Sequence, residues 1–163
     1  MSQDNSFFEK TKIQHKINEA RHNFIQGNVK SALLNYKEAI ALNPSNVKAE
    51  YGLAECYYKL QNYKKAKFHA EKAYLADPKI DDDILFLLGG TYFRLNEITK
   101  AKQKLSQFKE MTKSKSKLKD YGVDLKLAQI AYAETAKVNE KIIIKNMGNI
   151  LNSSAPEFAP AIS

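Results

Sequence analysis

The sequence has no tryptophan, only four prolines and a single cysteine, Cys56, among its 163 residues. One cysteine excludes an internal disulfide, so cysteine usage does not indicate the redox compartment. We expect Cys56 to pack as a small buried hydrophobic side chain. No apolar run approaches the ~18 residues that a membrane-spanning helix needs. The stretch MSQDNSFFEK lacks a basic region followed by an apolar one, so no signal peptide is expected in this sequence.

Motifs that carry catalysis are also lacking. The sequence has no Gly-rich phosphate loop and no Ser/His/Asp or Cys/His arrangement. The histidines His15, His22 and His69 have no acidic or cysteine partner that would complete a metal-binding set. The run Asp81–Asp83 is too short for a calcium loop and is expected to cap a helix. We therefore expect a protein that is not an enzyme and holds no metal or cofactor.

The charge is uneven along the chain. The formal net charge is +8, and the segment Lys100–Lys119 holds eight lysines against one acid, Glu110. Such a block could bind nucleic acid or another anionic polymer. It could equally be the solvated face of a helix that continues into a Lys/Ser loop. No arginine cluster or Gly-flanked aromatic motif accompanies it, which argues against a nucleic-acid module.

An internal repeat organises most of the chain. The segments NVKSALLNYKEAIALNPSN (28–46) and NYKKAKFHAEKAYLADPKI (62–80) superimpose with a shift of 34 residues. A third copy, EITKAKQKLSQFKEM (97–111), is one residue late, which places an extra residue in the turn at Asp81–Asp83. A 34-residue period is typical of helix–turn–helix repeats.

Small residues and prolines support this interpretation. Two helices can approach to ~8–10 Å only where small side chains lie at their crossing. Such residues recur at Ala20, Ala54 and Gly89 in the first helices and at Ala32, Ala66 and Ala101 in the second. Pro44 and Pro78 are expected to end the second helices, because proline cannot continue the hydrogen-bonding ladder.

The period and these residues resemble the tetratricopeptide repeat (TPR) family. Segment 47–80 is closest to its consensus, although Glu50 stands at the usual Trp and Gln61 at the usual turn Gly. The resemblance implies an all-α fold of three TPR helix–turn–helix repeats in a right-handed superhelix. We expect a TPR domain over 6–140, its first helix beginning at Ser6 with a Ser6–Glu9 capping box. The repeats are expected at 13–46, 47–80 and 82–115.

A C-terminal capping helix is predicted over 116–140, and a non-helical tail over 141–163. Leu118, Tyr121, Leu125, Ala128 and Tyr132 form one apolar stripe at steps of three and four residues. A stacked array of repeats leaves its last apolar face open, and such a helix would cover it.

In the TPR family the first helices line a concave groove. The resemblance implies that repeat positions 2, 5, 9, 12 and 13 face it. The partner-binding candidates at these positions are Ile17, Arg21, Phe24, Lys48, Tyr51, Glu55, Tyr58, Lys59, Phe86, Phe93 and Arg94, and the remaining positions hold Gln14, Ile25, Asp83 and Gly90. A groove of aromatic and charged side chains would suit an extended peptide or a helix. Some of these aromatics could instead pack between helices, and the capping helix could fill part of the groove.

The resemblance also offers a test for one known TPR activity, the two-carboxylate clamp by which co-chaperones bind a C-terminal carboxylate. The corresponding positions hold Ile17, Arg21, Gly52, Asp83 and Leu87. Only Arg21 could bind a carboxylate, so this clamp is not expected.

The segment IIIKNMGNILNSSAPEFAPAIS (142–163) reads as a strand and then a loop. It resembles the start of the propeller in bacterial envelope proteins that join a TPR region, a WD40-like β-propeller and an OmpA-like peptidoglycan-binding domain. The matching residues are Ile142, Ile144, Asn146, Met147, Gly148, Asn152, Ser153, Glu157, Phe158, Ala159, Pro160, Ile162 and Ser163. The resemblance implies that 141–163 is a linker and the start of a truncated propeller. It further implies a periplasmic, outer-membrane-associated protein linked to type IX secretion and gliding, with peptidoglycan bound only through domains absent here.

Three functions therefore stay open. The first is a non-catalytic interaction scaffold, the TPR region of a cell-envelope protein that docks a secretion or motility component. The second is a self-contained cytosolic TPR adaptor. The third is a basic module that binds nucleic acid or an anionic polymer through Lys100–Lys119.

Overall fold

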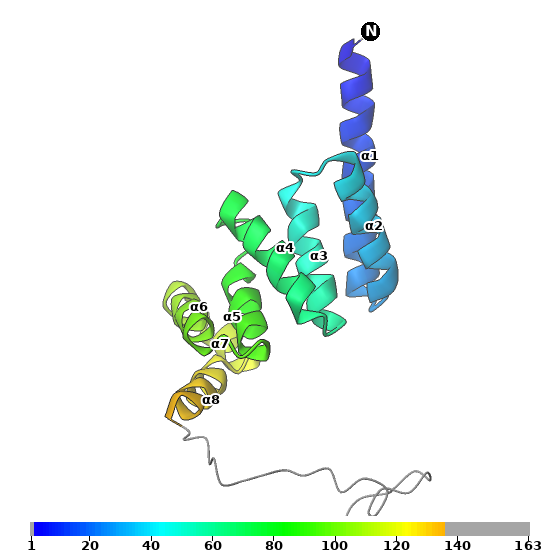
Figure 1. Ribbon diagram of the computed structural model, residues 1–163. Coiled ribbons are helices and arrows are strands. Elements are labelled where there is room, and N and C mark those ends of the chain that lie inside the picture. Colours follow the sequence, from blue (N-terminus) through cyan, green and yellow to red (C-terminus); the bar gives the residue numbers. More distant parts are fainter. Residues whose placement is uncertain (1, 136–163) are drawn as a thin grey trace, which may run out of the picture.

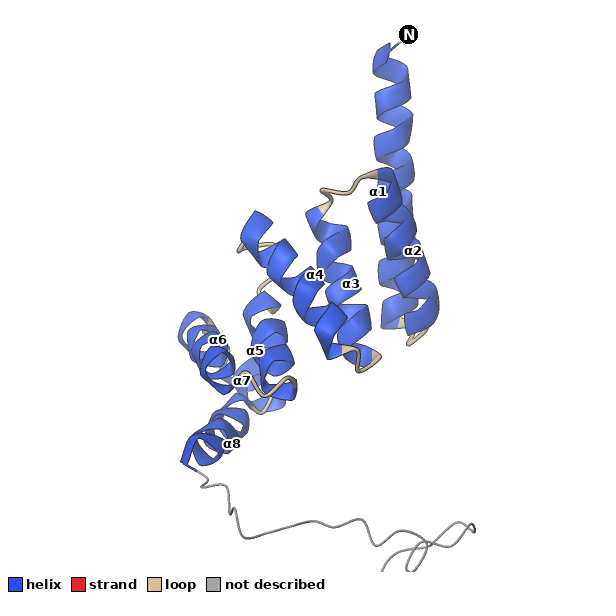
Figure 2. Cartoon of the chain, viewed as in Figure 1, coloured by secondary structure: helices blue, strands red, loops and turns tan. Residues whose placement is uncertain are grey.

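The computed structural model describes residues 2–135, which form eight helices and no strand (Figures 1 and 2). The helices are α1 (Ser2–Ile25), α2 (Val29–Leu42), α3 (Val47–Lys59), α4 (Tyr63–Ala76), α5 (Ile84–Arg94), α6 (Ile98–Met111), α7 (Lys115–Asp120) and α8 (Val123–Thr135). The pairs α1/α2, α3/α4 and α5/α6 pack within themselves and then on the next pair, so the three predicted helix–turn–helix repeats are confirmed. The predicted tail, 141–163, lies outside the described residues.

A left-handed residue closes the turn inside each repeat. Gly27, Gln61 and Asn96 have φ values of +80°, +58° and +59°. The step from Gly27 to Gln61 is one repeat period, and the step to Asn96 is one residue longer, as the extra residue near Asp81 predicts. Gln61 adopts this conformation although it carries a Cβ, because the turn geometry is common to all three repeats.

Small residues lie at the helix crossings, as predicted. The five alanines named at these crossings are completely buried. A Cβ added at Gly89 would lie 2.6 Å from Leu105 Cγ, and one at Gly52 would lie 2.1 Å from the Tyr36 ring. These glycines therefore allow close contact between α5 and α6 and between α2 and α3.

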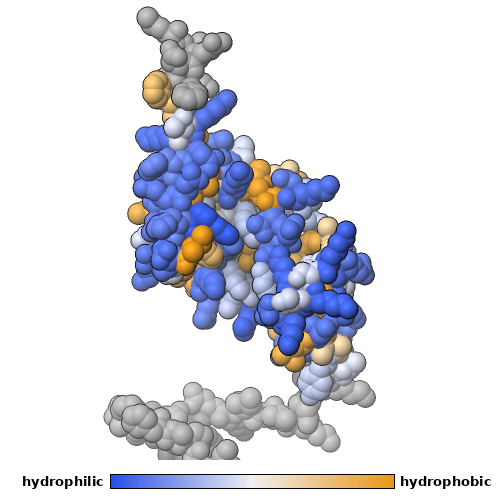
Figure 3. Space-filling model, turned by 180° about the vertical axis from the view of Figure 1, so that it is seen from behind, coloured by the Kyte–Doolittle hydropathy of each residue, from blue (hydrophilic) through white to orange (hydrophobic). Residues whose placement is uncertain are grey.

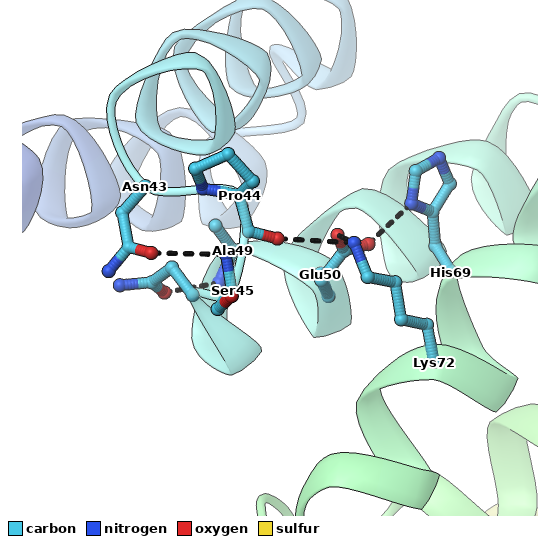
Figure 4. Close-up of polar contacts among 8 residues, drawn as sticks. Asn43, Pro44, Ser45, Ala49, Glu50, His69 and Lys72 are labelled. Carbon is cyan, nitrogen blue, oxygen red and sulfur yellow. Dashed lines mark hydrogen bonds and ion pairs between the residues drawn. The ribbon is translucent and has the colours of Figure 1, made fainter.

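A buried carboxylate ties the second repeat together (Figure 4). Glu50, at the position of the usual Trp, has a side chain only 3% exposed, and its two oxygens meet His69 Nδ1 at 2.6 Å and Lys72 Nζ at 2.5 Å. Lys72 Nζ also donates to the Pro44 carbonyl at 3.1 Å. His69 in turn stacks on Tyr57, with ring centroids 5.3 Å apart. These contacts join α3, α4 and the α2–α3 loop.

Two predictions about the helices differ from the structure: the residue at which the first helix begins and the single C-terminal capping helix. Helix α1 begins at Ser2, so Ser6 lies within it and does not cap it. The predicted capping helix is two helices, because Gly122 takes φ +58° and separates α7 from α8. This break resets the helical phase. As a result, Leu125 and Tyr132 are exposed, while Val123 and Ile130 are completely buried. Residues 136–140 of the predicted helix lie outside the described residues.

The role predicted for this C-terminal region is confirmed, although it forms two helices and not one. Helix α8 packs on α6, and Val123 and Ile130 join the core cluster that contains Leu105 and Phe108. Cys56, as predicted, is completely buried in the core of the first two repeats. Burial raises the pKa of its thiol to about 12, which keeps it protonated at neutral pH.

Candidate functional site

Two adjoining hollows lie along the first helices. The aromatic hollow, of about 260 Å³, is lined by Phe24, Tyr51, Glu55, Tyr58, Lys59, Asp83, Phe86, Leu87 and Tyr121. The charged hollow, of about 280 Å³, is lined by Gln14, Ile17, Asn18, Arg21, Tyr36, Lys48, Tyr51, Glu55, Ile80 and Asp81. Tyr51 and Glu55 line both hollows, and we call the two together the groove.

The structure brings nine of the eleven predicted site residues to this groove, the exceptions being Phe93 and Arg94. The Phe93 side chain packs against the core cluster around α5, and the Arg94 guanidinium lies 5.9 Å from the centre of the Tyr63 ring. Ile25 also lines neither hollow and is 68% exposed. The family positions therefore place the side chains of the first two repeats correctly except at Ile25, and they fail at the C-terminal end of α5. Whether these residues bind a partner stays a prediction.

Gly90 does not line the groove, but its lack of a side chain leaves room for Tyr58. A Cβ at this position would lie 2.9 Å from the Tyr58 hydroxyl oxygen. Any larger residue would therefore displace Tyr58, whose half-buried ring forms one wall of the aromatic hollow.

An ion pair spans the floor between the first two repeats. Arg21 Nη1 donates to the two carboxylate oxygens of Glu55 at 2.9 and 3.2 Å. The Glu55 side chain is 16% exposed, whereas Arg21 is about half exposed. Burial raises the pKa of the Glu55 carboxyl to about 7, although Arg21 opposes the shift, and the nearby charges of Asp81 and Asp83 add to it. The groove thus holds a carboxylate whose charge changes with pH near neutrality.

Two buried tyrosines form the base of the groove. Tyr36 and Tyr51 are at most 8% exposed. Burial is the main cause that raises the pKa of Tyr36 to about 12, and it also raises that of Tyr51. Both hydroxyls therefore stay neutral, and the rings offer flat apolar surface between the charged groups.

The C-terminal region closes the third-repeat end of the groove. The Tyr121 hydroxyl donates to Asp83 Oδ2 at 2.6 Å, and Lys117 Nζ lies 2.5 Å from Asp83 Oδ1. The Tyr121 ring lies 4.6 Å from that of Phe86, centre to centre, and Lys126 Nζ lies 5.3 Å from the Phe86 ring centre. Both possibilities left open by the sequence hold in part, because Phe93 packs against the core cluster around α5 and Tyr121 of the C-terminal region lines the aromatic hollow. Sequence patterns placed Tyr121 on an apolar stripe but gave no sign that it reaches Asp83.

The basic segment Lys100–Lys119 is largely occupied by contacts within the chain. Lys100, Lys102, Lys109 and Lys117 form ion pairs with Glu97, Glu134, Asp124 and Asp83, and Lys104 Nζ lies 4.2 Å from the Tyr74 ring centre. Lys113, Lys115 and Lys119 form no ion pair with the described residues. The block is therefore not a continuous array of free cations of the kind that tracks a phosphate backbone.

Residues 2–135 provide neither a metal site nor a membrane-spanning helix. No cluster of three His, Cys, Asp or Glu side chains in that range could hold a metal ion, and none of its helices is long and apolar enough to cross a membrane. The side of the molecule seen in Figure 3 is mostly hydrophilic, with hydrophobic side chains in separate patches.

The fold and groove geometry define a helical-repeat domain of the tetratricopeptide type. A family model described as a tetratricopeptide repeat matches residues 24–79, which is the second helix of the first repeat with its turn and the whole of the second. The solved structures similar to this chain confirm the TPR fold. No curated protein sequence matches the chain significantly.

Three solved structures illustrate the similarity. A Yersinia enterocolitica type III secretion chaperone, SycD, bound to a peptide of the translocator YopD, has a TM-score of 0.63 and 17% identity over 76% of this chain and 95% of that one. The second TPR domain of human RPAP3, bound to an HSP70 peptide, has a TM-score of 0.61 and 19% identity over 76% and 98%. YrrB, described as a TPR protein with an unusual peptide-binding site, has a TM-score of 0.63 and 24% identity over 74% and 59%.

Proposed function

We propose that this chain is a non-catalytic scaffold that binds a peptide or a helix of a partner protein in its groove. The observation that carries the proposal is the continuous lining shared by the two hollows. Aromatic rings from all three first helices line it together with charged groups. Such a surface gives apolar contact area together with charges that fix a ligand's register.

The similar structures support the proposal because two of them contain a bound peptide. The SycD and RPAP3 domains are each described in complex with a peptide. This chain shares their fold, and its groove lies mainly on the first helices of its repeats.

A selection of peptides from a random phage library on the immobilised protein would test the proposal. Binding of the selected, fluorescein-labelled peptides should then be compared for the intact chain and for Phe24→Ala and Tyr58→Ala, since both rings are half-buried in the groove wall. We expect each variant to weaken binding at least about tenfold, since central aromatic residues commonly dominate binding energy. The matched control is Phe68→Ala on α4, a ring that is 62% exposed and lines neither hollow. Equal binding by all variants would refute the proposal that the groove binds these peptides.

We further propose that the scaffold works in a bacterial cell envelope, as the periplasmic, outer-membrane-associated TPR region of a larger protein. A secretion or motility component would then be its partner. The support is the resemblance of residues 142–163 to the start of a propeller, and these residues lie outside the described part of the chain. The full reading frame would test this, and so would fractionation of cells that carry it. A cytosolic protein without a propeller or an OmpA-like domain would instead be the self-contained adaptor.

A further inference from the structure

The groove floor carries carboxylates in a chain whose formal net charge is +8. Glu55 of α3 and Asp81 of the α4–α5 loop line the charged hollow, and Asp83 lines the aromatic hollow beside it. These three acids lie close enough for Asp81 and Asp83 to raise the pKa of Glu55. The floor is thus a local concentration of negative charge at the centre of a basic molecule.

The three carboxylates differ in how far cations of the chain offset them. Glu55 is paired with Arg21, and Asp83 with Lys117. Asp81 Oδ1 accepts the backbone N–H of Asp83 at 2.9 Å, but the Asp81 carboxylate forms no ion pair within residues 2–135. Lys48 and Lys59 line the hollows too, but they are exposed at the rim and likewise make no ion pair with the floor in that range.

The chain itself shows which chemistry the groove accepts at its third-repeat end. There the Lys117 amine meets Asp83 and also lies 5.7 Å from the centre of the Tyr121 ring. An amine beside a carboxylate and an aromatic ring gains both Coulombic and cation–π attraction. The adjoining charged hollow offers the same two elements, with Asp81 as the carboxylate and Tyr51 as the ring, and no amine of the described residues forms an ion pair with Asp81.

We propose that the groove recognises a peptide segment centred on an arginine or lysine side chain, whose cation lies against Asp81 and Glu55 beside Tyr51. A neighbouring apolar side chain of the same segment occupies the aromatic hollow between Phe24 and Tyr58. The rim lysines favour acidic residues at the flanks of the segment but not at its centre. This inference rests on the proposed function and specifies its ligand, which is opposite in charge to the carboxylate that a co-chaperone clamp binds.

The test uses the fluorescein-labelled peptides selected on the intact chain, and compares Asp81→Asn with Asp82→Asn. Asn keeps the Oδ1 acceptor for the Asp83 N–H and removes only the charge. Asp82 is the adjacent exposed acid and lines neither hollow, so it is the matched control. We expect Asp81→Asn to weaken binding about tenfold, Asp82→Asn less than about twofold, and alanine at the central basic residue of the peptide about tenfold. The affinity for the intact chain should also fall as salt is raised.

A charge exchange completes the test. Asp81→Lys should abolish binding of the basic peptide and should bind the same peptide with glutamate at its central position. If the peptides require Phe24 and Tyr58 but tolerate Asp81→Asn and loss of their basic residue, this inference is overturned and the proposed function stands. If no selected peptide requires the groove aromatics, the proposed function fails and this inference with it.

Discussion

Arg21 and Glu55 stand at the same position of consecutive repeats, 34 residues apart, and their side chains join in an ion pair of 2.9 Å across the groove floor. The repeat therefore places two opposite charges in register, and stacking of α3 on α1 brings them together. The Glu55 carboxylate is largely buried, so its pairing with Arg21 bears on both the stability and the pH response of the domain.

Arg21→Met should destabilise the domain by roughly 1 kcal/mol. It removes the cation that offsets Glu55, and the effect stays moderate because Arg21 is about half exposed. Urea unfolding at pH 8, where Glu55 is mostly ionised, would measure the change. The double variant Arg21→Met/Glu55→Gln should recover most of the loss, since no buried charge then lacks a partner. A loss in the double variant equal to that in the single one would contradict this account.

The stability of the domain should fall with rising pH through the titration of Glu55. Its pKa is raised from an ordinary 4.5 to about 7 in the folded chain, so between these values the folded state holds more protons than the unfolded state. The free energy of unfolding therefore decreases as pH rises from 4.5 to 7. Urea midpoints at a series of pH values would show this decrease, and Glu55→Gln should abolish that part of the slope.

Glu97 provides a control of opposite sign. Hydrogen bonds from Lys67 and Lys100 lower the pKa of its carboxyl. Its contribution is therefore present above the ordinary pKa and is lost as pH falls through the lowered value. Glu97→Gln should leave the decrease between pH 4.5 and 7 in place, and a decrease that disappears in this variant would show that Glu55 is not its source.

Gln61→Gly should stabilise the domain by roughly 0.5–1 kcal/mol. Gln61 has φ +58°, and this left-handed region of backbone conformation disfavours residues that carry a Cβ. The reverse change, Gly27→Ala, should destabilise it by about as much. Gly27 has φ +80° and no atom within 4 Å of an added Cβ, so only the backbone conformation is tested there. Thermal or urea unfolding would measure both. Equal stability of all three proteins would mean that the turns relax at no cost.

Gly89→Ala should destabilise the domain by about 1–3 kcal/mol, because its Cβ would lie 2.6 Å from Leu105 Cγ and 3.2 Å from the Leu105 backbone nitrogen. Combining it with Leu105→Ala should cost less than the sum of the two single changes, since the smaller side chain removes part of the clash. Urea unfolding of the four proteins would give the coupling. Strict additivity would show that α5 and α6 separate freely.

Lys72→Met should destabilise the domain by roughly 1–2 kcal/mol. It removes an amine that meets both the buried Glu50 carboxylate and the Pro44 carbonyl. Lys64→Met on the same helix is the matched control, because Lys64 is exposed and has no ion pair within the described part of the chain. Unfolding by urea should separate the two variants, and equal stabilities would show that the Glu50 contacts add nothing.

The sequence by itself determined the repeat architecture. The 34-residue period, the small residues at the helix crossings and the prolines after the second helices are local or periodic features, and each has one packing consequence. The resemblance to the TPR family placed Arg21, Tyr51, Glu55 and Tyr58 on one face, and residues at equivalent repeat positions point in equivalent directions.

Only the tertiary structure decided how that face is completed. Gly122 adopts a left-handed conformation that restarts the helical phase, so the stripe predicted through Leu125 and Tyr132 turned outward. Tyr121 and Lys117 also contact Asp83, which lies in a segment far from them in the sequence. The backbone angle of one glycine and the pairing of distant charges have no periodic signature, because both depend on which surfaces meet after the repeats have stacked.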